Sequence, residues 1–81
     1  MESQAKHWLI QWLRRRNPGL EISESSKIYD DGLVDSFGIL ELLQDTEQHF
    51  SIYFQDHELR QKFFRTIDDF ARMIDKKISK S

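Results

Sequence analysis

Hydrophobic residues recur every three or four positions in three segments of the chain. In the first segment they are Ala5, Trp8, Leu9, Trp12 and Leu13, at i, i+3, i+4, i+7 and i+8. This spacing is that of one face of an α-helix. It predicts a helix over about residues 3–16, which the Asn-Pro-Gly sequence at 17–19 ends.

Two further helices follow from the same spacing. The hydrophobic side of residues 36–50 consists of Ile39, Leu42, Leu43, Thr46 and Phe50. The helix predicted over 66–78 has Ile67, Phe70, Ala71, Ile74 and Ile78 on one side. Its start is indicated by Thr66 with Asp69 three residues later, which is similar to a capping box with Asp in place of Glu.

The segments between these helices lack the helical period. Residues 17–35 contain spaced hydrophobic residues that we expect to fix the loop across the helices: Leu20, Ile22, Ile28, Tyr29 and Leu33. A loop of this length is uncommon in a compact domain and is often functional. An extended link follows Phe50, and a short helix is predicted at about 56–62. The fold class is therefore all-α: one four-helix bundle over 1–81, with a long first loop and a short third helix.

The amino-acid composition limits which covalent, metal and membrane features we expect. The 81 residues include no cysteine, so we expect no disulfide and no thiolate metal site, and any thiol must belong to an attached group. His7, His49 and His57 lack metal-ligand spacing, so we expect no metal site. No stretch is long and apolar enough for a membrane span, and the first residues lack the layout of a signal peptide. We expect a cytoplasmic monomer without stable membrane insertion.

The net charge of −2 hides an uneven distribution. Residues 17–59 contain ten acidic residues against Lys27 alone, whereas both flanking segments are net positive. An acidic region repels nucleic acid and attracts basic protein partners. Arg14, Arg15 and Arg16 suit the C-terminal end of the first helix, which explains them better than a nucleic-acid site does.

Ser36 is the strongest candidate functional residue. It follows Asp35 at the predicted start of the second helix, where N–H groups and the helix dipole favour a phosphate. By itself, a serine at this position is more often part of a helix cap than a modified residue.

The residues around Ser36 resemble a motif of a known protein family. The segment 32–38, Gly-Leu-Val-Asp-Ser-Phe-Gly, resembles the phosphopantetheine attachment site of acyl carrier proteins, whose usual core is Asp-Ser-Leu. Residues 50–52, Leu59 and residues 63–68 match the family's link, third helix and Thr-capped fourth helix in order and spacing. Phe37 and Gly38 are similar to D-alanyl and other stand-alone aminoacyl carrier proteins.

The resemblance implies a carrier protein and not an enzyme. Ser36 would bear 4′-phosphopantetheine, transferred from coenzyme A by a magnesium-dependent phosphopantetheinyl transferase, and Asp35 would lie beside the metal and phosphates during that transfer. The arm would carry an acyl or aminoacyl thioester from a loading ligase to an acceptor enzyme. Partner enzymes would contact one side of the second helix, formed by Phe37, Leu40, Glu41, Gln44, Glu47 and Gln48. We expect reversal of the charges of Glu41 and Glu47 to weaken loading without unfolding.

Other interpretations stay open at this point. The chain is alternatively an unmodified helical adaptor that binds partners without the arm. A hydrolase with Ser36 as nucleophile would need His49 or His57 as a base, brought close by the fold. The cargo is expected to be short or aminoacyl, because five aromatic residues after Phe50 would fill the interior: Tyr53, Phe54, Phe63, Phe64 and Phe70.

Overall fold

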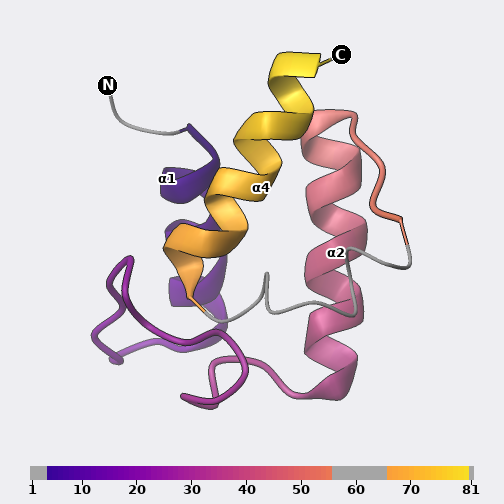
Figure 1. Cartoon of the computed structure of the whole chain (residues 1–81). Coiled ribbons are helices and arrows are strands. Elements are labelled where there is room, and N and C mark those ends of the chain that lie inside the picture. The colour runs from indigo at the N-terminus through magenta and orange to yellow at the C-terminus, as the bar shows by residue number, and fades with distance from the viewer. Residues whose placement is uncertain (1–3, 56–65, 81) are drawn as a thin grey trace.

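A computed structural model describes residues 4–55 and 66–80, and in this part of the chain every regular element is a helix (Figure 1). The helices are α1 (Gln4–Arg16), α2 (Ser36–Phe50) and α4 (Ile67–Lys80). The predicted bounds of α2 are confirmed, and α4 begins one residue later and ends two residues later than predicted. The predicted short helix at 56–62 lies outside the described residues, so the structure shows three helices of the expected four.

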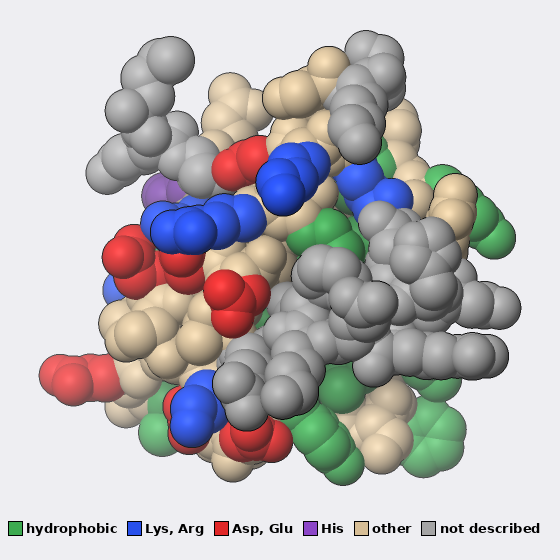
Figure 2. All heavy atoms as spheres, in the orientation of Figure 1, with side chains coloured by type: hydrophobic (Ala, Val, Ile, Leu, Met, Phe, Trp, Pro, Cys, Tyr) green, Lys and Arg blue, Asp and Glu red, His purple; other side chains and the backbone are tan. Residues whose placement is uncertain are grey.

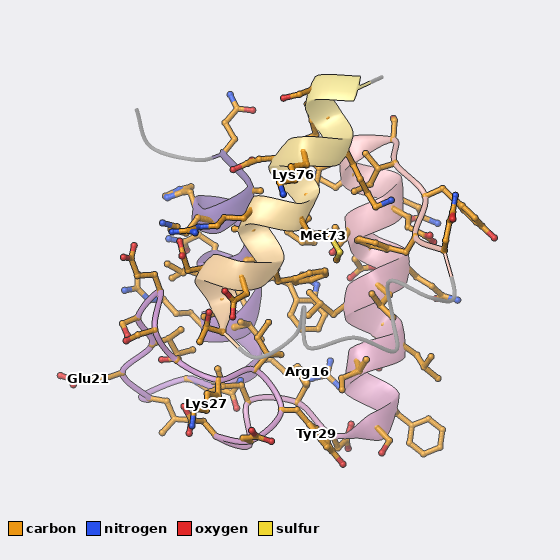
Figure 3. The ribbon with its side chains drawn as sticks, viewed as in Figure 1. Arg16, Glu21, Lys27, Tyr29, Met73 and Lys76 are labelled. Carbon is orange, nitrogen blue, oxygen red and sulfur yellow. The ribbon has the colours of Figure 1, made fainter. Side chains whose placement is uncertain are left out.

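The centre of the molecule is the contact between α1 and α4, which pack directly against each other. Three residues of α1 are fully buried, Ala5, Leu9 and Leu13, as the spacing predicted. From α4, the fully buried residues are Ile67, Phe70, Ala71 and Ile74. The prediction was wrong at Ile78, which is 38% exposed, while Met73 is buried and points toward α2 (Figure 3). Near the end of α4, therefore, the buried face rotates away from the predicted one.

Helix α2 meets α1 through large side chains. Trp8 and Trp12 are half-buried and pack against the core, together with Ile39 and Phe50 of α2. Leu42, Leu43 and Thr46 of α2 are buried, and the Thr46 hydroxyl donates to the Leu42 carbonyl at 2.6 Å. A tryptophan can fill a wide interhelical gap while its N–H keeps a polar partner. The two tryptophans therefore connect α1 to α2.

The loop over 17–35 closes the lower end of the bundle (Figure 1). Ile22, Ile28 and Leu33 are buried as expected, but Leu20 and Tyr29 are about half exposed and do not fix the loop. The backbone of the loop has a further role, because the carbonyls of Ser26 and Glu24 accept the N–H groups of Ile67 and Asp68, at 3.0 and 2.9 Å. These bonds satisfy donors that the first turn of a helix leaves unpaired.

The link after α2 is extended and partly buried. Ser51 ends the helix in the left-handed conformation, with φ of 55°. Phe54 is buried and its ring lies 5.6 Å from that of Phe70, whereas Tyr53 is 74% exposed. The prediction of rings filling the interior is thus confirmed at Phe54 and Phe70 and wrong at Tyr53; Phe63 and Phe64 lie outside the described residues.

Candidate functional site

The site forms where the loop enters α2, and the loop is shaped there by its own hydrogen bonds. The Lys27 N–H donates to the Asp31 carboxylate at 2.8 Å, and the Asp31 N–H donates to the Lys27 carbonyl at 3.1 Å. Gly32, with φ of 75°, donates to the Tyr29 carbonyl at 2.9 Å, in a conformation that favours glycine. Leu33 and Val34 are then buried, so the chain reaches residue 35 from a fixed direction.

Asp35 is the N-cap of α2. Its backbone is extended, and its Oδ1 accepts the Gly38 N–H at 2.7 Å, while its carbonyl accepts the Ile39 N–H at 3.0 Å. In an N-cap residue, the side-chain oxygen accepts an N–H of the first turn and the carbonyl accepts the first intrahelical hydrogen bond, as both do here. Asp35 therefore caps α2 through its side chain.

Ser36 is the first residue of α2 and is exposed to solvent. Its hydroxyl therefore lies at the N-terminal end of a helix of 15 residues, where the helix dipole favours a negatively charged substituent. His49 is 13 residues further along the same helix. At 1.5 Å per residue it lies about 20 Å from Ser36, too far to remove a proton from the hydroxyl.

Gly38 marks a close approach of three elements. A Cβ atom at this position would lie 3.0 Å from the Val34 Cβ, 3.2 Å from Nη2 of Arg16 and 3.2 Å from Oδ1 of Asp35. The loop, the end of α1 and the cap of α2 thus converge on the first turn that carries Ser36. The sequence pattern gave no sign of this contact, because a glycine inside a helix usually only lowers its stability.

Three of the side-chain contacts that join helices α1 and α2 follow matching four-residue steps. Arg16 Nη1 lies 3.1 Å from Oε2 of Glu41, between the end of α1 and the first turns of α2 (Figure 3). One turn away, Trp12 Nε1 donates to Asp45 at 2.8 Å, and one turn further Trp8 stacks on His49 with ring centroids 5.1 Å apart. The Arg16 guanidinium also lies over the Trp12 ring, at 5.3 Å from its centroid. We call these contacts the α1–α2 ladder.

The ladder changes the predicted partner-binding side of α2. Phe37 and Leu40 are 76% and 58% exposed, and Gln44 and Gln48 are exposed too. Glu41 is exposed but paired with Arg16. Glu47 is half-buried, and its Oε2 accepts the Phe54 N–H at 2.9 Å. Both carboxylates of this side thus have a partner within the protein, and its other exposed side chains are two apolar residues and two uncharged amides.

The surface seen in Figure 2 supports this description. Basic and acidic side chains lie side by side on the left of this view, where α1, the loop and α4 lie, and hydrophobic side chains gather at the lower right, toward α2. Opposite charges that lie this close largely cancel at a distance. On the left of this view, therefore, charged side chains of opposite sign are mixed and do not form a uniformly acidic area.

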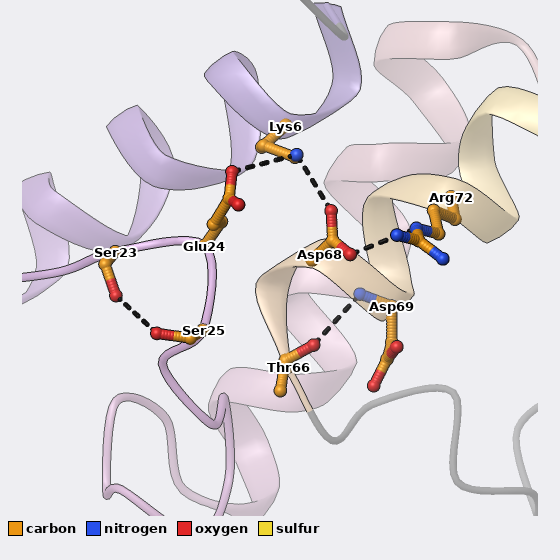
Figure 4. A network of polar contacts seen from close by, with 8 residues as sticks. All are labelled: Lys6, Ser23, Glu24, Ser25, Thr66, Asp68, Asp69 and Arg72. Atoms are coloured by element: carbon orange, nitrogen blue, oxygen red, sulfur yellow. Dashed lines mark hydrogen bonds and ion pairs between the residues drawn. The ribbon is translucent and has the colours of Figure 1, made fainter.

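One charged cluster holds the loop to the helices. Lys6 Nζ lies 3.0 Å from Oε2 of Glu24 and 2.8 Å from Oδ1 of Asp68, and Arg72 Nε lies 3.0 Å from Oδ2 of Asp68 (Figure 4). The hydrogen bond to Asp68, followed by that to Glu24, raises the pKa of Lys6 above its ordinary 10.5. The pKa of Asp68 is lowered below 3.8, chiefly by its hydrogen bond with Lys6.

Sequence reasoning missed Asn17, which it treated only as part of a helix stop. Its Nδ2 donates to the carbonyl of Leu13 in α1 at 3.0 Å and to that of Leu33 at 2.9 Å. The available signal was an asparagine at the end of a helix, a position where its side chain often bonds nearby backbone groups. A carbonyl partner 16 residues away is not visible in such a pattern.

Over 4–55 and 66–80, no group of three or more His, Cys, Asp or Glu side chains is arranged to hold a metal ion. Within the same ranges, no helix has the length and hydrophobicity needed to cross a membrane.

Comparison of the chain with protein-family models, with curated proteins and with solved structures found no significant match.

Proposed function

We propose that this protein is an acyl carrier protein that bears 4′-phosphopantetheine on Ser36. The observation that supports this most is the local geometry of Ser36: an exposed hydroxyl on the first turn of α2, after a cap by Asp35 and a loop packed through Leu33 and Val34. A transferase needs a hydroxyl that it can reach at a fixed position, and this arrangement supplies one. Once attached, the group supplies a thiol that holds acyl or aminoacyl cargo as a thioester.

The residues present fit such a group. The Ser36 hydroxyl is exposed and the helix dipole favours the negative charge of a phosphodiester there. Asp35 is exposed beside it and retains a second carboxylate oxygen besides the one that accepts the Gly38 N–H. In the proposed transfer, Asp35 would hold the start of α2 in place while that carboxylate lies beside the magnesium ion that the transferase uses.

The distance of His49 also favours a carrier over a hydrolase. A serine nucleophile needs a base within hydrogen-bonding reach, and about 13 residues of helix, roughly 20 Å, separate this histidine from Ser36. His7 lies in the first turns of α1, and the ladder pairs the opposite end of α1 with the start of α2. His57, the other candidate base, lies outside the described residues. In the proposed function Ser36 is modified, and the chemistry of the cargo occurs in partner enzymes.

A short or aminoacyl cargo is part of the proposal. Phe54 and Phe70 occupy the interior between α4 and the link after α2, and their rings lie 5.6 Å apart. Close packing of such rings leaves little room for a long acyl chain. Cargo of this kind would remain outside the bundle, at the end of the arm.

The test is an intact-mass measurement after incubation with coenzyme A, magnesium and broad-specificity phosphopantetheinyl transferases. We expect a gain of one phosphopantetheine in the unaltered protein and in Ser25→Ala, a matched control in an exposed loop serine, and no gain in Ser36→Ala. Asp35→Asn should keep the helix cap, because Asn caps helices as well as Asp does, but should slow the transfer. Absence of the gain with several transferases would favour the unmodified adaptor.

A further inference from the structure

The end of α1 holds both sides of the segment that carries Ser36. Before the serine, Asn17 Nδ2 donates to the carbonyl of Leu33 at 2.9 Å. After the serine, Arg16 pairs with Glu41 at 3.1 Å, and its Nη2 lies against Gly38. Asn17 thus contacts the chain before Ser36, at Leu33. The preceding residue, Arg16, contacts it after Ser36, at Gly38 and Glu41.

The Asn17 side chain is well suited to this role. Its Nδ2 lies within 3.0 Å of two carbonyl oxygens, those of Leu13 and Leu33. Only an NH₂ group offers two donors for two acceptors, so the contacts themselves establish which end of the amide is the nitrogen. Asn17 is partly buried, and so is each of these bonds. The side chain therefore joins the last turn of α1 to the loop at the point where the loop turns toward α2.

The geometry points to Asn17 as a positioning residue for the modification of Ser36, an inference that rests on the proposed function. Its hydrogen bond to Leu33 fixes the entry of the chain into Asp35, and Asp35 in turn caps α2 through the Gly38 N–H. Ser36 lies between these two fixed points. The side chain touches neither Ser36 nor any substrate, so it acts through the backbone. Small displacements of a reacting group are costly in rate, because productive geometry is narrow.

The variant that tests this is Asn17→Asp, which keeps the shape of the side chain and removes both N–H donors. We expect kcat/KM for phosphopantetheinyl transfer to fall about tenfold, in kcat more than in KM, because Phe37 and Leu40 on the outer side of α2 are left unaltered. Asn17→Ser, which retains one donor, should give an intermediate rate and carries the test if Asn17→Asp does not fold.

Thr46→Val is the matched control. It also removes one side-chain hydrogen bond to a backbone carbonyl, that of Leu42, but it lies ten residues along α2 from Ser36, about 15 Å away. At a temperature where all variants are folded, its rate of transfer should stay within about twofold of the unaltered protein. Equal rates for the Asn17 variants and Thr46→Val would overturn the inference.

A second measurement does not depend on the transferase. The N–H groups of Gly38 and Ile39 bond to Asp35, so their hydrogen exchange reports on the start of α2. We expect exchange about tenfold faster at both amides in Asn17→Asp and unchanged exchange in Thr46→Val. If the unaltered protein is not modified at all, the proposed function fails, and the exchange result still decides whether Asn17 positions this turn; unchanged exchange would contradict it.

Discussion

At the scale of single residues, the site depends on a few atoms that converge on one turn. Asp35 accepts the Gly38 N–H at 2.7 Å, and Gly38 itself is buried against Val34 and Arg16. Because the Val34 contact is to a Cβ atom, which the backbone fixes, there is little freedom to make room for a side chain at residue 38. Alanine at residue 38 would require its neighbours to move by a few tenths of an ångström, so the packing beside Ser36 favours glycine.

Gly38→Ala tests that preference. Alanine gains up to about 1 kcal/mol of helix propensity, but crowding of this kind costs about 1–3 kcal/mol, so we expect a net loss of about 1 kcal/mol in the free energy of unfolding. Ser36→Ala, on the same turn but exposed, should change it by less than about 0.5 kcal/mol. Urea unfolding of both variants measures the difference, and a Gly38→Ala protein at least as stable as Ser36→Ala would refute the packing argument.

At the scale of elements, α2 has two distinct sides. One joins α1 through the α1–α2 ladder, and the outer one exposes Phe37 and Leu40. The bounds of α2 and most of its buried residues were predicted from the sequence, because hydrophobic spacing reports burial directly. The function of its carboxylates was not, because an acidic residue on a helical wheel looks the same whether it meets solvent, Trp12 or the Phe54 N–H.

With the proposed function, this arrangement predicts that partner enzymes would recognise α2 through its exposed apolar side chains. Phe37→Ala and Leu40→Ala should each lower kcat/KM for transfer onto Ser36 about tenfold, since exposed apolar side chains are the part of this side that can become buried on docking. Their free energies of unfolding should change by less than about 0.5 kcal/mol. The exposed Gln48→Ala is the matched control.

The contacts of the α2 carboxylates also alter the expectation for charge. Glu47→Lys should destabilise the protein by about 1–3 kcal/mol, because it leaves the partly buried Phe54 N–H without its acceptor. Loading of the unaltered protein should depend only weakly on salt concentration, because Glu41 is ion-paired with Arg16 and the other exposed residues of this side, Phe37, Leu40, Gln44 and Gln48, are uncharged. A steep loss of loading at high salt, with Phe37→Ala and Leu40→Ala behaving normally, would contradict an apolar docking side.

At the scale of the whole molecule, the loop over 17–35 is the part that joins everything else. It accepts hydrogen bonds from the start of α4 and the start of α2, and its Asn17 side chain donates to the Leu13 carbonyl at the end of α1. The sequence indicated a functional loop, and burial of Ile22 and Ile28 confirms that it is packed. The contact of Glu24 with Lys6 and the side-chain bonds of Asn17 were not predictable, because single polar residues carry no periodic signal. The segment 56–65, with the predicted third helix, lies outside the described residues.

The Lys6 cluster predicts how this assembly responds to pH. Asp68 has a lowered pKa, so its contribution to stability is present above 3.8, its ordinary value, and is lost as pH falls through the folded value. Lys6 has a raised pKa, so its contribution is present below 10.5 and is lost as pH rises through the folded value. Lys6→Met should reduce both losses of stability. Thermal unfolding between about pH 2 and about pH 12 measures them, because this range includes the ordinary pKa values of Asp and Lys, about 4 and about 10. Lys76→Met, at an exposed position of α4, is the control, and a profile that Lys6→Met leaves unchanged would show that the cluster is not coupled to folding.

The central claim is that Ser36 is the point of attachment for an arm that carries cargo. The most direct test is the mass of the protein isolated from its own cells with thioesters kept intact, followed by fragmentation to locate any added group. The account predicts a phosphopantetheine on Ser36, with a further short acyl or aminoacyl mass on part of the population. A native protein with an unmodified Ser36, which also stays unmodified when incubated with coenzyme A and active transferases, would contradict it.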